Sequence, residues 1–181
     1  MITAAKFGPR GDPRVFGPIR IYRRHLPHLR VPGHPYFVTW RLHRLQRLLS
    51  DPERELVVQA ILHFSTKRYD ILGYAVMDDH VHVVVLPKPG VRLEDVVHSW
   101  KSFTANQLQR RSKRHGKVWQ NEYYERLIRS RRELSRTLKY VEQNPFKRWP
   151  TLTQYRWMWC SATVVTHPRK AGGGTPLDSG R

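Results

Sequence analysis

The sequence has a single cysteine, Cys160, among 181 residues. One cysteine cannot form an intrachain disulfide, and it excludes zinc sites that need several thiolates. Long hydrophobic runs are also missing, because no apolar stretch approaches the roughly 20 residues that cross a membrane as a helix. Residues 1–14 lack the apolar centre of a secretory signal. We therefore expect a cytoplasmic protein.

Acidic residues are scarce, 14 against 33 lysines and arginines, which gives a formal net charge of +19. A surplus this large indicates a polyanionic partner, because each cation that displaces a counterion from a phosphate backbone contributes binding free energy. An anionic membrane is the alternative. It usually requires a basic amphipathic helix or a lipidation motif, and neither is evident. Nucleic acid is therefore the favoured partner.

Composition varies along the chain and indicates one folded domain with two flanks. Residues 1–20 are rich in glycine, proline and arginine, which predicts a basic flexible arm. Residues 164–181 are rich in glycine and proline, and we expect a disordered tail. Residues 21–163 are long enough for one domain with a core, in keeping with a hydrophobic share of 39% for the chain.

The hydrophobic pattern alternates between strand and helix periods. It predicts strands at residues 34–42, 69–77, 80–87 and 117–128, and helices at 52–65, at 93–108 and from Ser130 onward. The first six elements follow the order β-α-β-β-α-β of the ferredoxin-like split βαβ arrangement. We therefore expect an α+β fold, with an antiparallel sheet, helices packed on one face, and an added C-terminal helix.

Two histidines stand in a run of valines in "HVHVVVLP", residues 80–87. On a strand, His80 and His82 point to one face, whereas the intervening valines point to the other. The valine side is the natural core face, which leaves the imidazoles side by side and close enough to bind one ion. The alternative is that both are ordinary histidines of a sheet. A metal site also needs a third ligand from elsewhere in the chain.

A candidate for that ligand lies in "KYVEQNP", residues 139–145. Tyr140 and Asn144 are four residues apart on a helix and so share one face. Pro145 disfavours helical geometry at Asn144, so we expect the helix to end there with the amide oxygen projecting from its end. Without the histidines, a tyrosine at a helix–sheet seam and a helix cap would explain both residues. Other possible third ligands are Glu142, Gln143, Asp78 and Asp79.

A tyrosine beside two histidines makes chemical sense if the substrate is a phosphodiester. The tyrosine hydroxyl is a weak nucleophile at neutral pH. Next to a divalent metal ion that polarises the phosphodiester, it can attack phosphorus in line. The product would be a reversible phosphotyrosine link to DNA and a free hydroxyl end. Tyr123 and Tyr124 are rival nucleophiles, although neighbours on a strand point to opposite faces, and aromatic packing or base stacking suits them better.

These motifs resemble the HUH single-tyrosine (IS200-like) transposases, and more closely the bacterial REP-associated tyrosine transposases. The resemblance runs from about residue 20 to 162, through "YRRHLPHLRVPGHPYFVTWRL", "YAVMDDHVHVVVLP", "WKSFTANQL", "VWQNEYYERLIRS", "YVEQNP" and "YRWMWCS". It implies the HUH endonuclease fold, Mg²⁺ or Mn²⁺ held by His80, His82 and Asn144, and Tyr140 as the nucleophile on the added helix. Family members usually have proline at the position of Asp78, which puts the rigidity of that turn in question.

The resemblance also implies a reaction and a substrate. Such proteins nick and rejoin single-stranded DNA beside palindromic, REP-like hairpins through a 5′-phosphotyrosine intermediate, in DNA transposition. It implies the bacterial cytoplasm, associated with the nucleoid, as the location. A monomer is expected for the REP-associated branch, whereas the wider group forms dimers that exchange a helix.

Basic residues concentrate between residues 101 and 140, beside the expected site. A charge run usually marks only a solvated face, but this concentration indicates that the segment grips phosphates. Trp100 and Trp119 are either further contacts or core residues. The expected DNA-binding residues are Lys101, Arg110, Arg111, Lys113, Arg114, Arg126, Arg129, Arg131 and Arg132.

Two other functions fit parts of the pattern. A domesticated relative could bind hairpin DNA without catalysis, although every matched catalytic position is filled. A replication or conjugation initiator of the HUH type often carries a tyrosine pair on one helix or a helicase domain, and the sequence has neither.

Overall fold

The computed structural model describes residues 20–23 and 27–161, so the expected arm (1–20) and tail (164–181) lie outside these residues, except for Arg20. Five antiparallel strands form the main sheet in the order β6-β3-β5-β4-β7. They are β3 (Tyr36–Arg41), β4 (Tyr69–Val76), β5 (His80–Pro87), β6 (Tyr124–Leu127) and β7 (Met158–Cys160). The other elements are the hairpin β1 (Arg20–Arg23) and β2 (Pro27–Arg30) and the helices α1 (Asp51–Leu62), α2 (Leu93–Ser112) and α3 (Arg131–Arg148).

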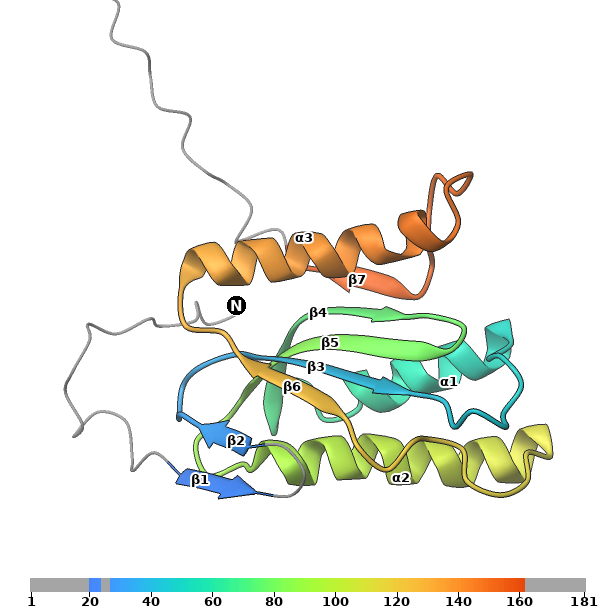
Figure 1. The fold of residues 1–181 in the computed structure, drawn as a ribbon, viewed down its shortest axis with the longest axis horizontal. Coiled ribbons are helices and arrows are strands. Elements are labelled where there is room, and N and C mark those ends of the chain that lie inside the picture. Colours follow the sequence, from blue (N-terminus) through green and yellow to red (C-terminus); the bar gives the residue numbers. More distant parts are fainter. Residues whose placement is uncertain (1–19, 24–26, 162–181) are drawn as a thin grey trace, which may run out of the picture.

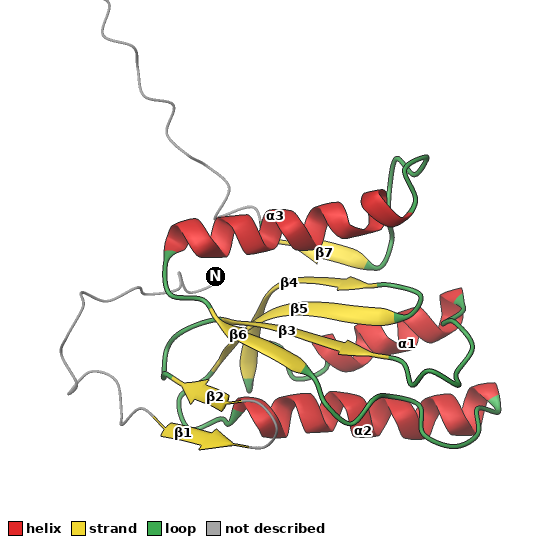
Figure 2. Ribbon diagram, viewed as in Figure 1, coloured by secondary structure: helices red, strands yellow, loops and turns green. Residues whose placement is uncertain are grey.

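Helices cover both faces of the main sheet (Figures 1 and 2). Val57 of α1 and Val97 of α2 belong to the larger core cluster on one face. Leu138 of α3 packs with Val84 of β5 in a smaller cluster on the other face. The arrangement confirms the expected α+β fold, in which a third helix is added to a sheet with two helices on one face. None of the described helices has both the length and the apolar character needed to cross a membrane.

Three strands were not expected from the sequence, the hairpin β1–β2 and the edge strand β7. Conversely, the strand expected at 117–128 is regular only from Tyr124 to Leu127. Before it, Trp119 makes a single bridge to Leu42 and is buried, and its indole N–H donates to the Thr104 hydroxyl at 2.9 Å. Packing this tryptophan into the core draws the segment away from regular strand pairing.

Helix α3 continues through Pro145 to Arg148, so the expectation that it ends at Asn144 is wrong. Proline removes one N–H from the helix, but the last turn is closed by the Trp149 N–H, which donates to the Pro145 oxygen at 2.8 Å. Pro145 is buried, and Arg148 forms an ion pair with Asp78 at 3.0 Å. These contacts offset the lost hydrogen bond, and Asn144 therefore projects from a helical turn.

Candidate functional site

Both histidines of β5 lie on the face of the sheet that α3 covers. In the register with β3, His80 lies opposite Arg41 and His82 lies opposite Thr39. The alternate residues of β5 are buried in the core beneath α1 and α2: Val81, Val83 and Val85. The face of each histidine expected from the period of two is thus confirmed.

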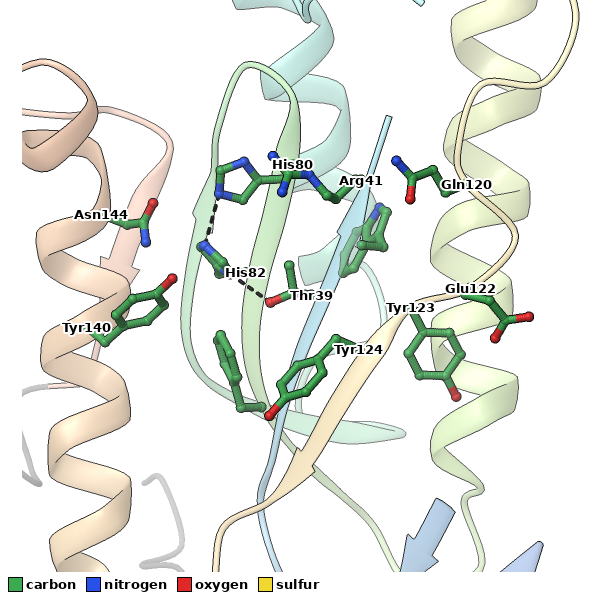
Figure 3. A pocket seen from close by; sticks show the side chains of 12 residues that line it. Thr39, Arg41, His80, His82, Gln120, Glu122, Tyr123, Tyr124, Tyr140 and Asn144 are labelled. Atoms are coloured by element: carbon green, nitrogen blue, oxygen red, sulfur yellow. Dashed lines mark hydrogen bonds between the residues drawn. The ribbon is translucent and has the colours of Figure 1, made fainter. Parts of the chain in front are cut away.

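The two imidazoles converge through their Nε2 atoms, which are 3.0 Å apart. Each Nδ1 atom has a partner behind it. The Nδ1 of His80 lies 2.5 Å from the Asp79 carboxylate, and the Nδ1 of His82 lies 2.7 Å from the Thr39 hydroxyl (Figure 3). Arg41 donates to the other oxygen of Asp79 at 2.7 Å. Histidines that bind metals typically hold the second ring nitrogen in this way, which orients the ring.

Burial and neighbouring groups together determine the pKa values of His82 and Asp79. Burial, and after it the charge of His80, lower the pKa of His82 to about 3, against a weaker opposing effect of the Asn144 side chain. Burial alone would raise the pKa of Asp79, but hydrogen bonds from Arg41 and His80 outweigh it and hold this pKa at about 2. At neutral pH the His82 imidazole is therefore uncharged, the form that a metal ion requires.

Helix α3 brings the tyrosine and the asparagine to the same place. Figure 3 shows the hydroxyl of Tyr140 and the amide of Asn144 directed toward the two imidazoles. The ring centroids of Tyr140 and His82 are 5.4 Å apart. Phe37 of β3 stacks on His82 at 5.4 Å and meets Tyr140 edge to face at 5.9 Å. Tyr140 remains 42% exposed, so its hydroxyl is accessible to a large substrate.

His80, His82, Tyr140 and Asn144 all line one open cleft with a volume of about 620 Å³. None of the alternative third ligands, which are Asp78, Asp79, Glu142 and Gln143, lines it. Asp78 instead pairs with Arg148 and Asp79 with Arg41. Within residues 20–23 and 27–161, no group of three or more His, Cys, Asp or Glu side chains could hold a metal ion. Of the residues considered as a third ligand, only Asn144 lines the cleft.

The donor set fits a divalent cation. Bonds of about 2.1 Å meeting at a right angle separate two ligand atoms by about 3 Å, which is the observed distance between the Nε2 atoms of His80 and His82. Imidazole nitrogens combined with an amide oxygen suit borderline to hard divalent ions. His80, His82 and Asn144 are therefore chemically able to hold Mg²⁺ or Mn²⁺.

Arg114, one of the expected DNA-binding residues, is buried in an ion pair. Its guanidinium donates twice to the Glu53 carboxylate, at 2.8 Å each, and to the backbone oxygens of Arg47 and Leu48. The two side chains are 1% and 3% exposed. Its donors hold the loop before α1, so Arg114 has no surface to offer to DNA.

Lys101 also has a structural role. Its ammonium group donates to the backbone oxygens of Gln120 and Asn121 at 2.8 Å each, and burial lowers its pKa to about 8. Both tryptophans considered as contacts are buried, and the Trp100 indole donates to the Tyr69 hydroxyl at 2.8 Å. The core reading of these tryptophans is therefore confirmed.

The other expected DNA-binding residues lie on two segments of the chain, and Figure 1 shows α2 and α3 on opposite faces of the sheet. One group is at the end of α2 and directly after it: Arg110, Arg111 and Lys113. The other extends from β6 to the first turn of α3: Arg126, Arg129, Arg131 and Arg132. The two groups occupy opposite ends and opposite faces of the sheet. The single basic surface expected beside the site is therefore divided.

Thr39 and Phe37 line the cleft but were not among the expected site residues. They share a face of β3 because they are two residues apart. Their contact with His82 depends on the register between β3 and β5, and no local signal in the sequence gives that register. Tyr124 lines the cleft beside Phe37, and Tyr123 lines it as well, with its ring near the Lys101 ammonium and packed against the core under α2.

Comparison with known proteins agrees with this architecture. The chain is similar to the structure of a REP-associated tyrosine transposase bound to a REP hairpin, with a TM-score of 0.57 and 20% identity over 87% of this chain and 98% of that chain. It is also similar to a Deinococcus radiodurans protein assigned to the transposases, with a TM-score of 0.45 and 18% identity over 60% of this chain and 88% of that one. No curated protein matches the sequence.

The fold is thus that of a tyrosine transposase. The model of the IS200-like transposases matches residues 31–144, a span that includes every residue of the cleft named above. The chain belongs to the IS200-like transposase family, and the resemblance stated from the sequence is confirmed.

Proposed function

We propose that the protein is a metal-dependent, single-tyrosine DNA strand transferase that nicks and rejoins single-stranded DNA beside palindromic hairpins. One observation carries this proposal. The Nε2 atoms of His80 and His82, the amide of Asn144 and the hydroxyl of Tyr140 meet in one open cleft, although the histidines and the two α3 residues are more than fifty positions apart in the chain.

His80, His82 and Asn144 would hold the divalent cation, Mg²⁺ or Mn²⁺. When bound, such an ion polarises a phosphodiester and stabilises the charge that develops on it. Asp79 and Thr39 keep the two imidazoles in the orientation that turns Nε2 toward the cleft.

Tyr140 would be the nucleophile. Its oxygen forms a bond to phosphorus while the bond from phosphorus to the 3′ oxygen of the preceding nucleotide breaks. The phenolic proton passes to solvent, and the departing oxygen takes up a proton to become a free 3′ hydroxyl. The 5′ phosphate stays on the tyrosine until a 3′ hydroxyl attacks it, which releases the tyrosine and rejoins the strand.

Hairpin DNA is the proposed substrate, supported by the net charge of +19 and by the hairpin bound to the structurally similar transposase. Because α3 packs on the sheet of its own chain, one chain supplies all four residues of the site. We propose accordingly that a monomer acts, in the bacterial cytoplasm and in association with the nucleoid.

The test uses labelled oligonucleotides that contain palindromes flanking the gene, incubated with and without Mn²⁺ and separated on a denaturing gel. We expect a metal-dependent covalent adduct in the wild type that is lost in Tyr140→Phe and in His80→Ala. Tyr124→Phe is the matched control, since it removes a neighbouring hydroxyl from the same cleft and should preserve the adduct. Tight binding without an adduct for every palindrome would instead support a non-catalytic, domesticated hairpin-binding protein.

A further inference from the structure

A groove extends along α3 from Tyr140 toward the first turn of the helix. It has a volume of about 340 Å³ and is lined by residues of β3, β6 and α3, among them Arg126 and Arg136. It shares Phe37, Tyr124 and Tyr140 with the cleft described above. Cleft and groove are therefore one continuous depression, and Tyr140 lies at the junction.

The register of the sheet explains why these side chains meet. Tyr124 pairs with Thr39, and Arg126 pairs with Phe37, so all four point to the face that α3 covers. His82 lies on the other side of Thr39 in the same row. Neighbouring strands are about 4.8 Å apart, which places Tyr124 roughly 10 Å from His82 across the sheet. Because β6 is an edge strand, the groove opens at the side of the sheet.

The floor of the groove is aromatic and accessible. Tyr124 is 49% exposed, an unusual value for a large ring on a sheet that a helix covers. Phe37 supports it, with ring centroids 6.3 Å apart in an edge-to-face arrangement. An exposed tyrosine held by a second ring presents a flat apolar face, and nucleic-acid bases stack on such faces whatever their sequence.

The walls of the groove carry positive charge. The Arg126 side chain is 63% exposed while its Nε atom lies 2.9 Å from the Glu133 carboxylate, so this side chain is oriented without being buried. Glu133 also accepts the Arg129 backbone N–H at 3.0 Å. Arg136 is exposed on α3 one turn before Tyr140. Two guanidinium groups thus stand beside one carboxylate that is already engaged.

We propose that this groove binds a single unpaired nucleotide next to the scissile phosphate, with its base stacked on Tyr124 and its phosphate between Arg126 and Arg136. The proposal rests on the proposed function, since the groove leads to Tyr140. A volume of about 340 Å³ lies at the small end of single-ligand pockets, which suits one base with its phosphate. Because a base can stack on the Tyr124 ring only when it has left a duplex, the groove would select substrates whose strand is unpaired where it leaves the hairpin.

Binding measurements test the groove separately from the chemistry. Fluorescein-labelled hairpins from palindromes flanking the gene are prepared with a single-stranded flank on either side, with the flanks removed, and with an abasic site in turn at each flanking position. Affinity is measured by anisotropy on the Tyr140→Phe protein without divalent metal, so that no cleavage is required. In this background, Tyr124→Ala should weaken binding of the flanked hairpin roughly tenfold. Tyr124→Phe, which keeps the ring, should not.

Three further comparisons sharpen the result. Tyr124→Ala should leave the affinity for the flankless hairpin unchanged. It should also cause no further loss of affinity for the oligonucleotide whose abasic site already removes the base that stacks on Tyr124. Arg136→Gln should weaken binding of the flanked hairpin and lower the salt dependence of this binding by the contribution of about one phosphate contact. Lys67→Gln, which removes an exposed charge on the loop between α1 and β4, is the control for net charge alone.

If Tyr124→Ala and Arg136→Gln both bind every flanked hairpin with wild-type affinity, the proposed role of the groove is wrong, even if the wild type forms its adduct. An equal loss on the flanked and flankless hairpins would also overturn it. Tyr124-dependent binding of the flank in a protein that forms no adduct would support the groove and reject only the strand-transfer function.

Discussion

Arg148 at the end of α3 lies 3.0 Å from the carboxylate of Asp78, so an ion pair joins this helix to the hairpin that carries His80. The Asp78 side chain is 10% exposed and the Arg148 side chain is 50% exposed. Asp78 lies in the turn between β4 and β5. Its contact therefore restrains this turn, and it also fixes the end of the helix that positions Asn144.

The first prediction concerns this ion pair. Arg148→Met should lower the melting temperature and reduce adduct formation several-fold, because the Asp78 carboxylate stays buried without its partner and α3 loses its anchor. Asp78→Asn combined with Arg148→Met should lose less than the sum of the single changes, since no unpaired charge remains. Thermal unfolding and adduct rates measure both effects. Strictly additive changes would show that the two residues do not interact.

The second prediction concerns Thr39. Thr39→Val keeps the shape of the side chain but removes the oxygen that lies 2.7 Å from the Nδ1 atom of His82. Loss of such a supporting contact typically costs about 10- to 100-fold in metal affinity, and we expect a loss of this size for Mn²⁺ measured by isothermal titration calorimetry. Thr39→Ser retains the hydroxyl and should bind Mn²⁺ as the wild type does. Unchanged affinity in Thr39→Val would remove Thr39 from the support of the site.

The third prediction separates two arginines that the sequence places together. Arg114→Met should destabilise the protein by about 1–3 kcal/mol, because the buried Glu53 carboxylate loses its buried partner and keeps only the more exposed guanidinium of Arg47. Arg111→Met, at an exposed position of α2, should change the free energy of unfolding by no more than about 0.5 kcal/mol. Urea denaturation of both variants provides the measurement. Similar stabilities would contradict the structural role of Arg114.

The same ion pair predicts a pH dependence. Burial raises the pKa of Glu53, but hydrogen bonds from Arg114 and Ser50 outweigh it and hold this pKa well below its ordinary value of 4.5. On acidification the unfolded state takes up this proton first, so the stabilisation is complete above about pH 5 and is lost progressively as the pH falls below 4.5. Glu53→Gln should show a shallower loss of stability between about pH 5 and pH 3. Parallel pH profiles for the two proteins would contradict this assignment.

The fourth prediction concerns the close approach of α3 to the sheet at Gly73. A Cβ atom there would lie 2.7 Å from Leu138 Cδ2 and 2.9 Å from Cys160 Sγ. Gly73→Ala should therefore destabilise the protein by about 1–3 kcal/mol. It should also slow adduct formation, because Leu138 is two residues from Tyr140. Adding Leu138→Val makes room and should restore part of both losses. No recovery in this double variant would place the strain elsewhere.

Much of the site could be predicted from local spacing. The period of two puts His80 and His82 on one face of a strand, and the valines between them identify the face that is buried. The helical period brings Tyr140 and Asn144 onto one face of α3. These inferences succeed because each depends only on backbone geometry over a few residues.

Other features depend on contacts between distant segments. Thr39 supports His82 only because β3 and β5 pair in one particular register. The sequence predicts that Arg114 is a surface cation, but the fold buries it beside Glu53, which lies 61 residues away in the chain. Pro145 predicts that the helix ends at Asn144. The helix instead continues to Arg148, because the burial of Pro145 and the ion pair of Arg148 outweigh the lost hydrogen bond.

The sequence by itself determined the order of four strands and three helices, the family of the protein and the faces of His80, His82, Tyr140 and Asn144. Only the tertiary structure decided that these four side chains meet in one cleft, that the basic residues divide between two sides of the sheet, and that a groove with Tyr124 and Arg126 adjoins Tyr140. The physical reason is that strand register and helix docking depend on many contacts between segments far apart in the chain, whose free energies add up. The spacing of residues within one segment does not contain this information.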